Sequence, residues 1–300
     1  MKHRNVAALL SAWSDDEKYI LVIEYCEEKT LLCYMKLYAN KVCLREQRKT
    51  KWGTLSRIDV YKFYIQRVPE LETAMVMSQL CRAVEYLHKN DIIHRDIKLG
   101  NVLRTGNCIK LADFGLAINF RTENSRHICG TPNFLSPEVY AEKYHSPASD
   151  IWAVGCVLYS LLAGANPFEF TDLKDTGKRI MNMEFTIPEF FSDEAKEAIQ
   201  CIMTDQHKFR YNHEKLKSQA KTRFRPSARE VLKLPLFAKY GIMPLGVPKD
   251  SKHRRSKAEP GPSSRSRSKT NPENEERTCK RALFCKAGFK IFCANTFALA

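Results

Sequence analysis

The chain contains 300 residues, of which 44% are hydrophobic, and it carries a formal net charge of +15. This composition is typical of a globular protein and excludes a wholly disordered chain. No uncharged stretch approaches the roughly 18 residues of a membrane-spanning helix, so we expect no membrane partner. The N-terminal residues do not resemble a signal peptide, and the 11 cysteines form no C-x-x-C pair. Both features favour reduced thiols in the cytosol or nucleus.

Most of the positive charge lies in three segments. Residues 41–68, 206–223 and 244–290 carry net charges of +6, +5 and +8, so the remainder of the chain is net negative. Because the basic residues are concentrated outside the core pattern, we do not expect nucleic acid as a partner. The first two segments are either family-specific inserts or translated non-coding sequence. Residues 244–300 predict a basic, largely disordered tail, whose KDSKHRRSK run is either a nuclear import signal or a solubilising segment.

The first elements in chain order are a β-hairpin and two helices. Val6–Trp13 and Tyr19–Ile23 are rich in strand-forming residues, and the polar residues Ser14–Lys18 predict the turn between them. Residues 27–40 could form a short helix, and apolar residues at near-helical spacing predict a longer one over Glu70–His88. These apolar positions are Leu71, Met75, Leu80, Val84 and Leu87.

The stretch over 92–115 carries the chemistry. It places a carboxylate (Asp96), an ammonium (Lys98) and an amide (Asn101) close together, and a second carboxylate, Asp113, follows 17 residues after the first. Transfer of a phosphoryl group from ATP to a hydroxyl needs such groups. Asp96 can orient the hydroxyl and take its proton, while Lys98 can steady the γ-phosphate. Asn101 and Asp113 can hold Mg²⁺.

Two further helices are expected after this stretch. The first opens at Asp150 and is apolar through Leu162. The second is predicted over Asp193–Met203, and its inward-facing residues are Ala195, Ala198, Ile199 and Ile202.

The order H-R-D-x-K-x-x-N followed by D-F-G resembles the catalytic and metal-binding loops of protein kinases, in their serine/threonine form. Four longer phrases resemble the Polo-like kinases: HRDIKLGN, CGTPNFLSPEV, DIWAVGCVLYSLLAGANPFE and LPLFAKYGIMP. The resemblance implies an α+β, protein-kinase-like fold with a mostly helical C-lobe and a truncated β N-lobe. It places a partial kinase domain over 1–237, with an N-lobe remnant at 1–23, a hinge at 24–26 and a C-lobe at 27–237 that contains both basic inserts.

The resemblance also implies the nucleotide and substrate sites. Asp96 would be the base, and Thr131 would bond both Asp96 and Lys98 beneath the substrate. ATP would be bound with Mg²⁺, which Asn101 and Asp113 would hold. The residues expected around the adenine are the gatekeeper Ile23, the hinge residues Glu24 and Cys26, and Leu103.

Structural and regulatory roles follow from the same comparison. Glu138 would be buried against Arg225, and Asp150 would accept backbone N–H groups of the catalytic loop. In the Polo-like kinases an activating threonine stands where this chain has His127, so Arg95 lacks the phosphate with which it would pair. Ser125 is either its replacement or an ordinary exposed loop serine.

Two departures from the family leave two classes of function open. The 300 residues contain no G-x-G-x-x-G loop, and residues 247–300 lack the strand pattern of a polo box. One class is an active ATP-dependent kinase that phosphorylates Ser or Thr of protein substrates and has a cell-cycle role. The other is a catalytically silent, kinase-like binding protein, and we expect the 300-residue chain alone to be weakly active or inactive. The expected location is cytoplasmic or nuclear, to which the family resemblance adds the centrosome.

Overall fold

The computed structural model describes residues 2–14, 18–38, 67–141, 144–168, 173–204 and 225–242. Most of the basic insert 41–68, all of 206–223 and the tail over 244–300 lie outside the described residues, and the expectations for these segments lie outside them too.

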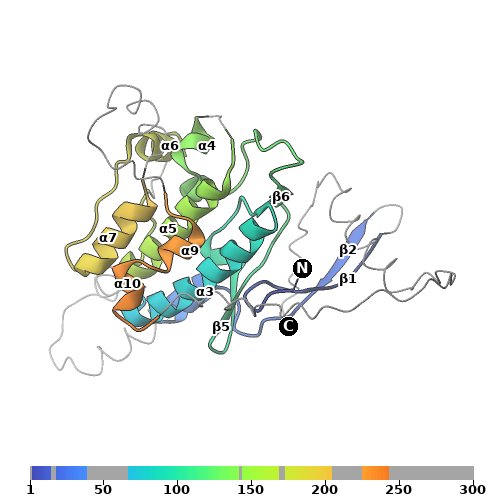
Figure 1. Ribbon diagram of the computed structural model, residues 1–300, viewed down its shortest axis with the longest axis horizontal. Helices are drawn as coiled ribbons and strands as arrows, with labels where there is room; N and C mark the ends of the chain where they lie inside the picture. Colours follow the sequence, from blue (N-terminus) through green and yellow to red (C-terminus); the bar gives the residue numbers. More distant parts are fainter. Residues whose placement is uncertain are drawn as a thin grey trace, which may run out of the picture.

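Helices α3, α5 and α7 form the centre of the described structure (Figure 1). Helix α3 spans Glu70–Lys89, α5 spans Pro147–Ala163 and α7 spans Asp193–Ile202. Almost every residue of α5 is buried, and α3 and α7 pack against it. A helix that is apolar on all sides can be stable only inside such a core. The short helices α9 (Ala228–Val231) and α10 (Pro235–Ala238) complete this helical body.

Local signals explain where α5 begins and ends. Ser146 and Ser149 form a reciprocal capping box, and Pro147 occupies the first turn, where its missing N–H costs nothing. Gly164 adopts a left-handed φ of 81° and ends the helix. The sequence had predicted that this helix begins at Asp150, but it begins three residues earlier, at Pro147.

The helix predicted over Glu70–His88 is present as α3. Of its five apolar residues at near-helical spacing, Leu80, Val84 and Leu87 are fully buried, whereas Leu71 and Met75 are 49% and 45% exposed. The buried face of α3 also runs through smaller residues and Met77. Its buried residues before Leu80 are Thr73, Ala74, Val76, Met77 and Ser78.

Three small antiparallel sheets accompany the helices in the described ranges. Strand β1 (Leu9–Ser14) pairs with β2 (Tyr19–Ile23), β3 (Ile92–Ile93) pairs with β6 (Ile118–Asn119), and β4 (Val102–Thr105) pairs with β5 (Cys108–Leu111). The molecule is therefore an α+β fold in which helices dominate.

Strand β1 begins three residues later than the expected Val6. Val6 instead forms an isolated parallel bridge with Leu111, and the backbone N–H of Ala7 donates to the carbonyl of Leu111 at 2.9 Å. The start of the chain is thus attached to the β4–β5 hairpin before it enters the β1–β2 sheet.

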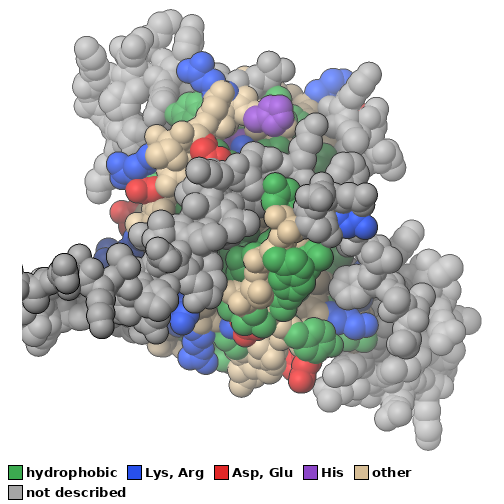
Figure 2. Space-filling model, turned by 90° about the vertical axis from the view of Figure 1, so that its right-hand side faces the viewer, with side chains coloured by type: hydrophobic (Ala, Val, Ile, Leu, Met, Phe, Trp, Pro, Cys, Tyr) green, Lys and Arg blue, Asp and Glu red, His purple; other side chains and the backbone are tan. Residues whose placement is uncertain are grey.

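The β1–β2 hairpin is separated from the helical body (Figure 1). Its exposed surface is rich in apolar side chains. Figure 2 faces this side of the molecule and shows hydrophobic side chains gathered near its centre. The exposed apolar residues of this hairpin include Leu10, Trp13, Tyr19, Leu21 and Ile23.

The remaining elements are short. A helix over 31–38 agrees with the one predicted within 27–40, and α7 ends one residue before the predicted Met203. Helix α6 (Leu173–Asn182) was not predicted. Helix α4 spans Pro137–Tyr140, and the 3₁₀ turns η1 and η2 span Leu99–Asn101 and Pro132–Phe134. None of the helices in the described ranges is long and apolar enough to cross a membrane.

Candidate active site

The loop that follows β3 is held in place by Asp150 of α5. This carboxylate is 2% exposed and accepts the backbone N–H groups of His94 at 2.9 Å and Arg95 at 3.0 Å. His88 lies 2.9 Å from the same side chain. Burial disfavours the charge of Asp150, but its hydrogen bonds with His88 and the His94 backbone, together with the nearby imidazoles, lower its pKa. The contact expected for Asp150 is present, and it fixes the loop that carries Asp96.

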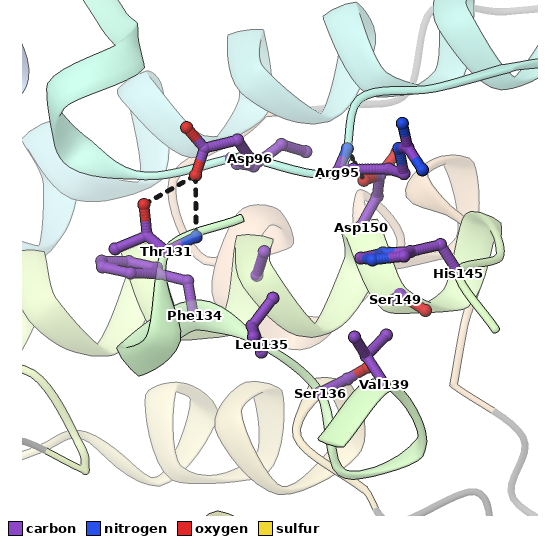
Figure 3. Close-up of a pocket in the computed structure, with 12 residues that line it drawn as sticks. Arg95, Asp96, Thr131, Phe134, Leu135, Ser136, Val139, His145, Ser149 and Asp150 are labelled. Atoms are coloured by element: carbon purple, nitrogen blue, oxygen red, sulfur yellow. Dashed lines mark hydrogen bonds between the residues drawn. The ribbon is translucent and has the colours of Figure 1, made fainter. Parts of the chain in front are cut away.

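Asp96 lies at the centre of a hydrogen-bond network with Thr131, Lys98 and Asn101, and Figure 3 shows its bonds with Thr131. Its Oδ1 accepts the backbone N–H of Thr131 at 3.0 Å and the hydroxyl of Thr131 at 2.7 Å. Its Oδ2 accepts Lys98 Nζ at 2.8 Å and Asn101 Nδ2 at 2.9 Å. Lys98 Nζ also donates to Thr131 Oγ1 at 2.9 Å. The structure therefore brings Asp96, Lys98 and Thr131 together with the contacts that the sequence predicted.

Asn101 and Asp113 provide oxygen atoms suited to Mg²⁺. The Nδ2 of Asn101 donates to the backbone carbonyl and carboxylate of Asp96, so its Oδ1 remains available as a ligand. The backbone N–H of Ala112, the residue before Asp113, donates to the backbone carbonyl of Asn101 at 2.9 Å. Asp113 is exposed, with a φ of 62°.

One amide and one carboxylate are too few ligands for a metal ion bound by protein side chains alone. They suit a Mg²⁺ ion that is also bound by water and by substrate phosphates. Mg²⁺ commonly uses one or two carboxylates together with water and the phosphates of a substrate. Within the described residues, no group of three or more His, Cys, Asp or Glu side chains could hold a metal ion. Asn101 and Asp113 therefore fit a nucleotide-associated Mg²⁺.

The expected hinge residues follow β2 directly. The backbone N–H of Glu24 donates to the Ala8 carbonyl at 2.8 Å, and its carboxylate pairs with Lys110 at 2.9 Å. The hydrogen bond from Lys110 is the main reason why the pKa of Glu24 is lowered. The Glu24 side chain is thus directed to Lys110, and any contact with adenine falls to its backbone. Sequence reasoning missed this ion pair, because Glu24 and Lys110 of β5 lie far apart in the sequence.

The other residues expected around the adenine lie near this hinge in the chain or on β4. Ile23, at the end of β2, is 51% exposed, whereas Cys26 is 8% exposed. Within the described part of the chain, the backbone N–H of Cys26 makes no hydrogen bond. Leu103 is half-buried on β4 and forms an isolated antiparallel bridge with Thr30. The bridge brings Leu103 to the segment that leaves the hinge.

Glu138 and Arg225 form the buried ion pair expected from the sequence. Arg225 Nη2 donates to Glu138 Oε2 at 2.9 Å, and its Nη1 donates to Oε1. Burial opposes the charge of Glu138, but Arg225 outweighs burial and lowers its pKa. The guanidinium also lies 4.9 Å from the ring centre of Trp152, and its Nε donates to the Thr204 carbonyl. The pair joins α4, at the end of the activation segment, to the late part of the domain.

The activation segment is held by His145, which sequence reasoning missed. The His145 backbone N–H donates to the Ser125 carbonyl at 2.9 Å, and its ring lies 3.7 Å from Cys129 Sγ. Burial and then the charge of Arg95 lower the pKa of His145 to about 4, so the ring is neutral at pH 7. A single histidine in a loop gave no signal in the sequence. Figure 3 shows His145 beside Arg95 and Asp150.

Arg95 itself has a left-handed φ of 68°, and its Nε donates to the Leu116 carbonyl at 2.5 Å. Ser125 is half-buried and His127 is exposed. Ser125 and Leu116, whose carbonyl accepts the Arg95 hydrogen bond, thus lie on the same segment. The Arg95 side chain is not bonded to Ser125 in the described residues.

The fold and the Asp96 network are those of a protein kinase catalytic core. The family model for the protein kinase domain matches residues 1–221, and the chain belongs to this family.

Among its relatives are Polo-like serine/threonine kinases. The chain is 32% identical over 206 residues to serine/threonine-protein kinase polo of Drosophila melanogaster, a match that covers 68% of this chain and 31% of the relative. It is 34% identical over 206 residues to PLK1 of Xenopus laevis and 33% identical over 207 residues to PLK2 of Mus musculus. Those matches cover 68% of this chain and 30% and 26% of the relatives. The chain thus spans about a third or less of the length of these relatives.

Proposed function

We propose that this chain transfers the γ-phosphoryl group of ATP to serine or threonine hydroxyls of protein substrates. The observation that carries the proposal is the position of Asp96, whose two carboxylate oxygens are fixed by Thr131, Lys98 and Asn101. A fixed carboxylate can orient a substrate hydroxyl in line with the phosphate, and positioning supplies most of the catalysis in this reaction.

Each neighbour of Asp96 has a distinct part in the proposed reaction. The substrate hydroxyl would donate to Asp96 and lose its proton to this carboxylate. Lys98, held 2.8 Å from Asp96, places a positive charge where the transferred phosphoryl group gains negative charge. Asn101 and Asp113 would hold Mg²⁺, which neutralises phosphate charge when it is bound.

At the other end of the proposed site, the hinge residues would bind the adenine. The backbone of Glu24 and Cys26 would bind the adenine edge, with Ile23 and Leu103 supplying apolar contacts. The expected cell-cycle role, and a location in the cytoplasm, nucleus or centrosome, are supported by similarity to the Polo-like kinases alone. Microscopy of the tagged chain through the cell cycle would test them.

The direct test is phosphorylation of casein by the purified chain with Mg²⁺ and labelled ATP. Because the 300 residues contain no G-x-G-x-x-G loop, we expect slow turnover. An extended chain, preceded by the Gly-rich loop, strand lysine and helix-C glutamate of a Polo-like relative, should be much faster. Asp96→Asn should reduce turnover by about a thousandfold or more in either chain, in line with loss of the base and of substrate orientation.

Asp91→Asn is the matched control, because Asp91 is partly exposed and pairs with Arg121 away from the reaction centre. An extended chain that binds ATP but transfers no phosphate would support the alternative of a silent, kinase-like binding protein. Turnover that survives Asp96→Asn would overturn the proposed role of Asp96.

A further inference from the structure

The segment that leaves the hinge is attached to β4 by backbone contacts. The backbone N–H of Glu28 donates to the Arg104 carbonyl at 3.2 Å, and the N–H of Arg104 donates to the Lys29 carbonyl at 2.9 Å. Thr30 then forms its bridge with Leu103. Lys29 has a left-handed φ of 64°, which a non-glycine residue keeps only where its surroundings impose it.

The side chain of Arg104 reinforces this attachment. Its Nε lies 3.0 Å from the carboxylate of Glu28 and 3.0 Å from the Gly106 carbonyl. The other oxygen of Glu28 accepts the backbone N–H of Gly106 at 3.1 Å. Glu28 is therefore fixed by both the side chain of Arg104 and the turn that follows it.

The same guanidinium also joins two helices. Its Nη1 lies 3.1 Å from Glu72 of α3, and its central carbon lies 4.1 Å from the ring centre of Tyr34 in the helix over 31–38. The Tyr34 hydroxyl donates to the same Glu72 oxygen at 2.6 Å. Burial and this carboxylate raise the pKa of Tyr34 to about 12, so it remains a hydrogen-bond donor at physiological pH. Only 18% of the Arg104 side chain is exposed, which strengthens its charge interactions relative to a surface pair.

We propose that Arg104 is a positioning residue for nucleotide binding: it holds the chain after the hinge against β4 and α3, and so sets the position of Leu103 relative to Cys26. The inference rests on the proposed kinase function. Leu103 and Arg104 are consecutive in β4, so their side chains project from opposite faces of the strand. One face can therefore contact the adenine while the other holds the segment in place.

Loss of Arg104 should loosen the strained turn at Lys29. Arg104→Met removes the charge and the planar contact with Tyr34, and it leaves Glu28 and Glu72 without their shared cation. Arg104→Lys keeps the charge, but an ammonium group cannot contact as many partners at once as the planar guanidinium. This variant should therefore show a smaller change than Arg104→Met. Arg121→Met is the matched control: its Nε pairs with Asp91 at 2.6 Å, but its side chain is 70% exposed.

Two measurements on the full chain test the inference. The first is the Kd of a non-hydrolysable ATP analogue with Mg²⁺, which Arg104→Met should raise about three- to thirtyfold, as for mutations that act through packed neighbours. The second is hydrogen exchange of the unliganded chain. Arg104→Met should speed exchange of the amides of residues 28–34 while exchange within α5 is unchanged, and Arg121→Met should alter neither measurement.

These measurements separate the inference from the proposed function. If the unmodified chain binds no nucleotide, the proposed function fails. Faster hydrogen exchange of residues 28–34 in Arg104→Met would then support only the claim that Arg104 holds this segment in place. If the unmodified chain binds the analogue and Arg104→Met leaves its Kd unchanged, the inference is wrong. It is also wrong if exchange over 28–34 is unchanged, or if exchange rises equally throughout the chain, because Arg104 would then have only a general role in stability.

Discussion

The hydroxyl of Thr131 donates a hydrogen bond to Asp96 Oδ1 at 2.7 Å, and the backbone N–H of Thr131 donates to the same oxygen at 3.0 Å. The two residues are 35 positions apart in the sequence, one in the catalytic loop and one in the activation segment. Their contact makes the orientation of the proposed base depend on the conformation of the activation segment. A kinase can be regulated through such a dependence.

We expect Thr131→Val to reduce turnover of the extended chain by about 10- to 100-fold, the value of a hydrogen bond to a charged group. Thr131→Ser should retain most of the activity, because it keeps the hydroxyl. Steady-state kinetics with casein would measure both. A greater loss in Thr131→Ser than in Thr131→Val would show that the methyl group matters more than the hydroxyl.

Asp113→Asn should weaken the response of turnover to Mg²⁺ by removing a negatively charged ligand. We expect turnover to fall by orders of magnitude at about 1 mM Mg²⁺ and to recover in part at higher concentrations. Removal of the metal with a chelator should abolish activity in the unmodified extended chain. Thermal unfolding should be nearly unchanged because Asp113 is exposed. Normal activity of Asp113→Asn would show that this carboxylate does not hold the metal.

Breaking the ion pair between Glu138 and Arg225 should destabilise the fold. Arg225→Met leaves the Glu138 carboxylate buried without its cation, which costs about 3–5 kcal/mol of unfolding free energy. The double variant Glu138→Gln with Arg225→Met should lose less than Arg225→Met alone. Urea unfolding followed by circular dichroism would measure this difference, and strictly additive losses would show that the two side chains are not coupled.

Stability should depend on pH through His145. Its pKa is about 4 in the fold against an ordinary value of 6.5, so the unfolded chain binds more protons between these values. The contribution of neutral His145 to the free energy of unfolding is therefore complete above about pH 6.5, and it is lost as the pH falls towards 4. His145→Gln, which does not titrate, should show a shallower fall in unfolding free energy, by on the order of 2 kcal/mol over this range. Parallel curves for the two proteins from pH 7.5 to about 4.5 would contradict the assignment.

The activation segment should show whether this chain is regulated by phosphorylation. On the resemblance to the Polo-like kinases, His127 is expected to replace their activating threonine, so we predict that regulation is either absent or shifted to Ser125. Phosphopeptide mapping of the activated extended chain, compared with Ser125→Ala, would distinguish these cases. A phosphate on Ser125 and a loss of activity in Ser125→Ala would support the shift. Unchanged activity, with no phosphate from Thr122 to Thr131, would support the unregulated form.

The sequence by itself determined the features that depend on short spacing. Asp96, Lys98 and Asn101 lie within six consecutive residues, so their order was enough to predict that they act together. The helix over 193–202 also followed from the sequence, because its apolar residues recur at helical spacing. The contact between Glu138 and Arg225, 87 positions apart, was predicted only through resemblance to kinases.

Tertiary structure alone decided which side chains meet across distant elements. Leu71 and Met75 match a helical pattern but face outward, because the packing of α3 chose a face that includes Ala74 and Met77. His145 and Arg104 carry no motif, and they become informative only when Ser125, Glu72 and Tyr34 are brought beside them. Residue spacing specifies local geometry, whereas burial and ion pairing between elements depend on how the whole chain packs. The proposed reacting groups were therefore predicted from the sequence, and the contacts that position them required the fold.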